Sequence, residues 1–280
     1  MSASYESCSF CPQLCRHLCP VAVATGHEAA TPPKMMAAVL LAQRGRIPPE
    51  DAARAATLCT DCGACERHCK YGIEVPALLA QARARYASPA TVQPVPAIQG
   101  NATLVALYCD ERRWGPALAD ALGQPVATMA TSDHLGQALL EHRDRAAAHL
   151  ASLNAACSGH KVVCCCSRCG ESLDAAKISW VRLETLLPPT WDGPVYLCHG
   201  KLDFPGQPLE RPPTCCGAHG PLEASHPALA ADVARDAAAM LPSTSVATPD
   251  SACRNALRGV GADVRDPIDL LLAPNTPPAT

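Results

Sequence analysis

The chain has 280 residues, 48% of them hydrophobic, and its 23 basic and 26 acidic side chains give a net charge of −3. This length suits about two domains with ordinary cores. The balanced charge gives no indication of a protein built to bind nucleic acid or an anionic membrane surface. No apolar run approaches the roughly 18 residues that span a bilayer, and the N-terminus lacks the basic start and apolar stretch of a signal peptide.

The chain contains 18 cysteines. Disulfide frameworks need an oxidising compartment, and nothing in the sequence directs the chain to one. We therefore expect a cytoplasmic protein in which the cysteines bind metal.

Two short runs near the N-terminus hold eight of these cysteines. The run from Cys59 to Cys69 has the spacing C-x2-C-x2-C-x3-C, and the run from Cys8 to Cys19 has one extra residue and is followed by Pro20. In such a run three thiolates bind one cubane cluster and the fourth binds a neighbouring cluster. The spacing predicts two [4Fe–4S] clusters, with Cys8, Cys11, Cys15 and Cys69 on the first and Cys59, Cys62, Cys65 and Cys19 on the second. Zinc is the alternative, although its cysteines usually form two distant pairs.

Helical patterns surround the two runs. Lys34–Arg44 follows two prolines and stops at Gly45, and both Pro49–Leu58 and Val75–Tyr86 have a proline in the first turn, where the missing N–H is tolerated. We therefore expect an α-helical ferredoxin-like domain over residues 1–87, with the cysteine runs in loops between helices. Residues 88–100 contain three prolines and no charge, which predicts a semi-rigid linker.

Apolar runs alternate with helical patterns after residue 100, and this alternation predicts an α/β fold. The expected strands are Thr103–Tyr108, Pro125–Ala130, Lys161–Cys165, Ser179–Leu183, Pro194–Cys198 and Ser245–Ala247. The expected helices are Gly136–Ala156, Pro227–Leu241 and Ala252–Leu257.

The α/β region divides into two halves, residues 101–190 and 191–280, which align at an offset of 84 residues. In this alignment Cys169 falls on Cys253 and Cys166 on Asp250. The second half has a cysteine pair, Cys215-Cys216, where the aligned positions of the first half are Thr131 and Ser132. We interpret the halves as two degenerate copies of one cysteine-rich pattern.

Cys215-Cys216-Gly217 and its flanks resemble the CCG (cysteine-rich) domain of heterodisulfide reductase subunits. The whole chain is similar to the iron–sulfur subunits of heterodisulfide reductases and of glycolate, lactate and glycerol-3-phosphate dehydrogenases. This resemblance implies the electron-transfer subunit of an oxidoreductase, which relays electrons between a flavoprotein partner (an FAD-linked dehydrogenase) and another carrier. It also implies a location in the cytoplasm or at the inner membrane through that partner. The sequence has no G-x-G-x-x-G after a strand, so a flavin belongs on the partner.

The resemblance further implies a third iron–sulfur cluster, held by Cys198, Cys215, Cys216 and Cys253. Asp250 stands where a fifth ligand would be, either as a ligand to labile iron or as a non-ligand, because a carboxylate matches iron–sulfur chemistry less well than a thiolate. In the first half Cys109, Cys166 and Cys169 are candidate metal ligands. That site holds zinc with one more group, or it is an empty remnant.

Three alternatives remain open at this point. The second-half cluster could itself reduce a disulfide, which would make the chain a catalytic subunit like that of a heterodisulfide reductase. The cysteines could instead hold zinc in an interaction module. His199 and His219 could each donate a hydrogen bond to a cluster or be loop residues without such a role.

Overall fold

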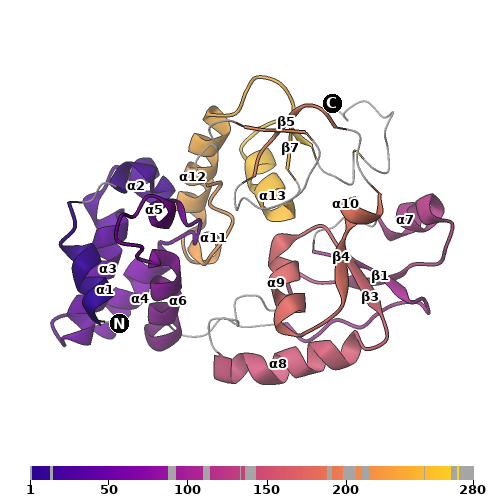
Figure 1. Cartoon of the computed structure of the whole chain (residues 1–280), viewed down its shortest axis with the longest axis horizontal. Coiled ribbons are helices and arrows are strands. Elements are labelled where there is room, and N and C mark those ends of the chain that lie inside the picture. Colours follow the sequence, from indigo (N-terminus) through magenta and orange to yellow (C-terminus); the bar gives the residue numbers. More distant parts are fainter. Residues whose placement is uncertain are drawn as a thin grey trace.

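The computed structural model describes residues 2–12, 15–87, 93–109, 114–132, 134–135, 143–187, 191–197, 206–209, 215–248, 250–265 and 270. Helices fill the described chain up to Tyr86, and two parallel sheets with their helices follow (Figure 1). The described part of the chain contains no helix long and apolar enough to cross a membrane. Its cysteines are all free thiols.

The N-terminal region contains six α-helices among its described residues. These are α1 (Ser2–Ser9), α2 (Pro20–Thr25), α3 (Pro32–Gln43), α4 (Pro49–Thr57), α5 (Ala64–Arg67) and α6 (Val75–Tyr86). The three helices expected from the prolines therefore form within a residue or two of their predicted ends. The loop placement of the cysteine runs is wrong for Cys8, which lies in α1, and for Cys65, which lies in α5.

Tyr5 explains why α1 forms although no helix was expected there. The side chain of Tyr5 is 2% exposed, and its hydroxyl donates a hydrogen bond of 2.7 Å to the carbonyl of Leu78 in α6. Burial of an aromatic side chain with its polar end satisfied stabilises a short helix whose own propensity is weak.

The core of the helical region extends into the C-terminal part of the chain. Met35, Met36 and Leu79 form its centre, and Leu222 and Val233 pack into the same cluster of buried side chains. Leu222 begins α11 (Leu222–Ser225), and Val233 lies in α12 (Pro227–Ala239). Figure 1 shows both helices beside the N-terminal helices, so the two regions share one hydrophobic core.

The first α/β half is built on a parallel sheet in the order β2-β1-β3-β4. Its strands are β1 (Leu104–Tyr108), β2 (Ala127–Ala130), β3 (Lys161–Cys164) and β4 (Trp180–Arg182). Its helices are α7 (Gly115–Leu122), α8 (Arg143–Ala156), α9 (Ser167–Ala175) and α10 (Leu183–Leu186). Gln99, at the end of the expected linker, forms an antiparallel bridge to Thr128, so the linker ends against the sheet edge.

The second half repeats this strand order as β6-β5-β7-β8, again with parallel pairing. The strands are β5 (Pro194–Val195), β6 (Gln207–Pro208), β7 (Val246–Ala247) and β8 (Val264–Arg265), and α13 (Ser251–Gly259) follows β7. Helices α9 and α13 begin 84 residues apart. The expected strand Pro194–Cys198 is shorter than predicted, and Cys198 itself lies outside the described residues.

Arg83 is a buried cation that joins three segments of the helical region. The residue is 2% exposed; its Nη1 donates to the carbonyl of Ala56 at 3.1 Å and its Nη2 to Asp61 Oδ2 at 2.7 Å. A buried guanidinium is stable only when its donors are satisfied. Arg83 therefore fixes the loop between Cys59 and Cys62 to α4 and α6.

Replacing Arg83 by Met should lower the free energy of unfolding by about 1.5–3 kcal/mol, the usual range for hydrogen bonds to charged groups. Arg85→Met is the matched control, since Arg85 is an exposed residue on the same helix, over the Tyr86 ring. Anaerobic denaturant unfolding followed by circular dichroism measures both. Equal losses in the two variants would contradict this role of Arg83.

Candidate metal centres

The loop after Cys59 turns three thiols toward one cavity. Asp61 (φ 54°) and Gly63 (φ 67°) both adopt left-handed backbone, which Asp tolerates and Gly adopts freely. The cavity, with about 330 Å³ of space including its opening to solvent, lies among Cys19, Cys59, Cys62, Cys65, Met35, Val75 and Leu79. The four cysteines predicted for the second cluster thus line one apolar cavity.

The other four N-terminal cysteines also lie together. Burial and the neighbouring thiols of Cys15, Cys11 and Cys69 raise the pKa of Cys8 to about 12. The rings of His17 and His68 meet edge to face at 6.1 Å, so the two cysteine runs also touch outside the thiol group.

These thiols fit a bound iron–sulfur cluster. Burial and the nearby Cys62 raise the pKa of Cys19 to about 11. Without a metal, such a thiol therefore stays protonated and neutral. Iron binds their deprotonated forms and offsets the cost of burying negative charge. The amides of Asp61 and Ile73 donate to the sulfurs of Cys59 and Cys69 at 3.4 and 3.5 Å, as is suitable for thiolate ligands.

A loop from the second α/β half covers the second cysteine run. The pKa of Cys62 is raised well above its usual value. The largest cause is a hydrogen bond between the Cys62 and Cys215 thiols, and the second is burial. The Cys215 sulfur also accepts from the Gly217 amide at 3.4 Å. Gly220 lies so close that a Cβ there would be 2.9 Å from the Cys59 carbonyl oxygen. Cys215 is therefore directed toward the N-terminal cysteines.

The remaining second-half cysteines meet a histidine and a carboxylate. The sulfurs of Cys216 and Cys253 are 3.2 Å apart, and His219 Nε2 lies 3.5 Å from the Cys253 sulfur and 3.4 Å from Asp250 Oδ1. Burial lowers the pKa of His219, but the Asp250 carboxylate outweighs it and raises the pKa overall. His219 is thus a buried neighbour of Cys253 rather than a loop residue without contacts.

Asp250 caps α13, because its Oδ1 accepts hydrogen bonds from the amides of Ala252 and Cys253 at 2.9 and 3.2 Å. This is the ordinary use of an N-cap carboxylate. Three of the ligands predicted for a third cluster are described. Cys216 lies beside Cys253, and Cys215 contacts Cys62.

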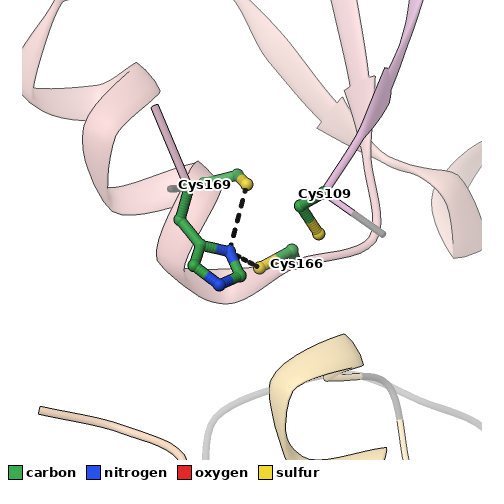
Figure 2. A group of neighbouring side chains, drawn as sticks. Cys109, Cys166 and Cys169 are labelled. Atoms are coloured by element: carbon green, nitrogen blue, oxygen red, sulfur yellow. Dashed lines mark hydrogen bonds between the residues drawn. The ribbon is translucent and has the colours of Figure 1, made fainter. Parts of the chain in front are cut away.

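The first half brings its three predicted ligands together and adds a fourth. Figure 2 shows the sulfurs of Cys109, Cys166 and Cys169 turned toward one another. His134 Nδ1 lies 3.3 Å from the Cys166 sulfur and 3.7 Å from the Cys169 sulfur, and the four donor atoms are within 4.8 Å of one another. Hydrogen bonds from Cys166 and Cys169 lower the pKa of Cys109 to about 5. His134 has no fixed sequence spacing to the cysteines and was not predicted.

Residues 4–73 match the family model described as 4Fe-4S dicluster domain. No curated protein and no solved structure matches the chain. The matched segment holds both cysteine runs and the three helices between them. The N-terminal region is therefore a dicluster domain with cysteine-rich iron–sulfur sites, and such a domain transfers electrons to or from a redox partner.

We expect Gly220→Ala to weaken the contact between the 215–220 loop and the second cysteine run. The new Cβ would meet the backbone of Cys59 and Thr60 at 2.9 and 3.0 Å, and such overpacking costs about 1–3 kcal/mol. Gly45→Ala is the control, since Gly45 has the same left-handed φ (66° against 67°) with no atom within 4 Å of an added Cβ. Thermal unfolding measures both, and an equal loss of stability in the two would rule out the close approach.

Proposed function

We propose that this chain is the iron–sulfur electron-transfer subunit of an oxidoreductase complex. The observation that carries the proposal is the gathering of eight cysteines from two runs into two groups within a region that matches a dicluster family. Cys8, Cys11, Cys15 and Cys69 would hold the first [4Fe–4S] cluster, and Cys19, Cys59, Cys62 and Cys65 the second. Each cluster, when bound, takes up and releases one electron.

The residues of the chain set the conditions for this transfer. Met35, Val75 and Leu79 keep water from the second site, and low solvent access is one of the protein's means of setting a cluster potential. The Asp61 and Ile73 amides, aimed at the sulfurs of Cys59 and Cys69, stabilise the more negative, reduced state. The apolar lining and the amide hydrogen bonds thus both act on the cluster potential, and neither is a catalytic group.

We propose that a redox partner docks beside the first group. Cys11, Cys15 and Cys69 are partly exposed, and two of the most exposed aromatic side chains, Phe10 (76%) and Tyr71 (69%), are close to them in sequence. Exposed aromatic rings next to a redox centre suit a partner interface, where aromatic side chains are enriched. A flavoprotein, as in the families that the chain resembles, is the partner we infer.

The second group of cysteines meets the C-terminal region through Cys62 and Cys215. The contact of Cys62 with Cys215 offers a short, buried connection from the second site toward Cys216 and Cys253. The matching strand orders of the two α/β halves and the offset of 84 residues support two copies of a CCG-type unit. We infer that electrons pass between the partner and a second carrier along this line, with a third centre at Cys198, Cys215, Cys216 and Cys253.

Iron analysis of cysteine variants tests the crossed ligation. The oxygen-free protein should contain about eight irons in its dicluster domain. Cys19→Ala and Cys59→Ala should each lose about four irons, and the double variant should lose no more, because both residues serve one cluster. Cys19→Ala combined with Cys8→Ala should lose about eight.

Cys157→Ala is the control for this series, since Cys157 is a buried thiol at the end of α8. It should keep the iron content of the original chain. If the Cys19 and Cys59 variants add their losses, the crossed assignment fails.

Phe10→Ser and Tyr71→Ser should slow electron exchange with the flavoprotein partner several-fold without loss of iron. The matched control is Met240→Ser, since Met240 is also exposed (58%) but lies after α12 in the second half. Stopped-flow bleaching of the visible absorption, with the reduced partner in excess, gives the second-order rate. Unchanged rates in both aromatic variants would exclude this docking surface.

The pair Cys216 and Cys253 favours a second candidate, reduction of a disulfide at the C-terminal site. Their sulfurs lie 3.2 Å apart and next to His219, and in the heterodisulfide reductases that the chain resembles a cluster held by such cysteines cleaves the disulfide. Both residues are 0% exposed, so a substrate would need an opening that the described residues do not provide. Turnover of small disulfides by the purified chain with a reduced viologen would establish this activity.

A further inference from the structure

We propose that Cys109, His134, Cys166 and Cys169 bind one zinc ion in a closed tetrahedral site. The site is separate from the eight cysteines of the dicluster domain and does not depend on the proposed electron transfer.

The spacing of the donor atoms fits a single metal ion. Zn–S bonds of about 2.3 Å and Zn–N bonds of about 2.0 Å place tetrahedral ligands about 3.5–3.8 Å from one another. His134 Nδ1 lies 3.3 and 3.7 Å from the sulfurs of Cys166 and Cys169, and all four donors are within 4.8 Å.

The fold brings the three cysteines together for a simple reason. Cys109 directly follows β1, and Cys166 lies just after β3 as the N-cap of α9. Because β1 and β3 are adjacent and parallel, their carboxyl ends meet at one sheet edge. Cys169, in the first turn of α9, completes the set, and the helix N-terminus favours the thiolate form of these ligands.

His134 is held in place by its own loop. His134 and Leu135 both have left-handed backbone, with φ of 53° and 58°, which is unfavourable for side chains of this size. The loop is fixed by Ser172 Oγ, which donates to the His134 carbonyl at 3.1 Å, and by the Leu135 amide, which donates to Thr131 Oγ1 at 3.1 Å. Leu135 itself is buried in the core of this half. The strained backbone holds the imidazole within 3.3–3.7 Å of the Cys166 and Cys169 sulfurs, as a ligand role requires.

The set of ligands indicates a structural rather than a catalytic zinc. Three cysteines and one histidine fill all four positions, whereas a catalytic zinc keeps one for water or substrate. The site also lies where the two α/β halves touch: the Cys109 sulfur is 3.2 Å from Ser251 Oγ, and Arg168 donates to the Ala218 carbonyl at 3.1 Å. A zinc ion here would fix the sheet edge against which the second half packs.

The experiment measures zinc and iron together in the full chain, expressed and purified without oxygen. The original chain should retain about one zinc after dialysis against a chelator. In His134→Ala the zinc affinity should fall more than about 100-fold, since loss of an outer partner alone costs about 10–100-fold. The iron content should not change. His134→Cys should retain the metal, and His160→Ala should retain it too, because the His160 side chain hydrogen-bonds to the Ala102 carbonyl and is not one of the four donors.

X-ray absorption at the zinc edge on the original chain keeps the proposal testable if His134→Ala does not fold. Three sulfur ligands and one nitrogen ligand are expected, and four sulfurs in His134→Cys. An original chain without zinc, a zinc shell without nitrogen, or loss of iron instead of zinc in His134→Ala would each overturn the proposal. The dicluster assignment fails on different grounds, namely absence of iron with zinc still present.

Discussion

The constraint on which this structure depends is the crowding of buried thiols. At Cys8 and Cys19, burial and the neighbouring sulfurs oppose the deprotonation that metal binding requires, and the pKa of each thiol is raised. Bound metal cations reverse this balance. Two local features hold the loop between Cys59 and Cys62: the left-handed backbone at Asp61 and the buried Arg83, which donates a hydrogen bond to Asp61.

The two α/β halves share one strand order but carry different side chains after the third strand. In the first half Cys166 is the N-cap of α9, the helix after β3. In the second half Asp250 is the N-cap of α13, the helix after β7. The aspartate uses its oxygen to accept two helix amides, so it is already engaged within the protein. The first half is left with three thiols and an imidazole, whereas the second is left with a cysteine pair beside His219.

The sequence was informative where local chemistry decides the outcome. Prolines marked the starts of α3, α4 and α6, and apolar runs marked β1 and β3, because capping and burial act over a few residues. Helix α7 was missed, and so was the contact between Cys62 and Cys215, which depends on docking of segments far apart in the chain. His134 was not predicted as a candidate ligand for a related reason. Its loop is held by Ser172, and no sequence spacing connects these two residues.

The cover over the second cysteine run has a consequence for biosynthesis. Cys62 and its neighbour Cys215 are separated by 153 residues of chain. At ordinary translation speeds the first leaves the ribosome on the order of 10–30 s before the second. The second cysteine run of the nascent helical region is therefore uncovered for that interval, until the late-emerging loop closes over it.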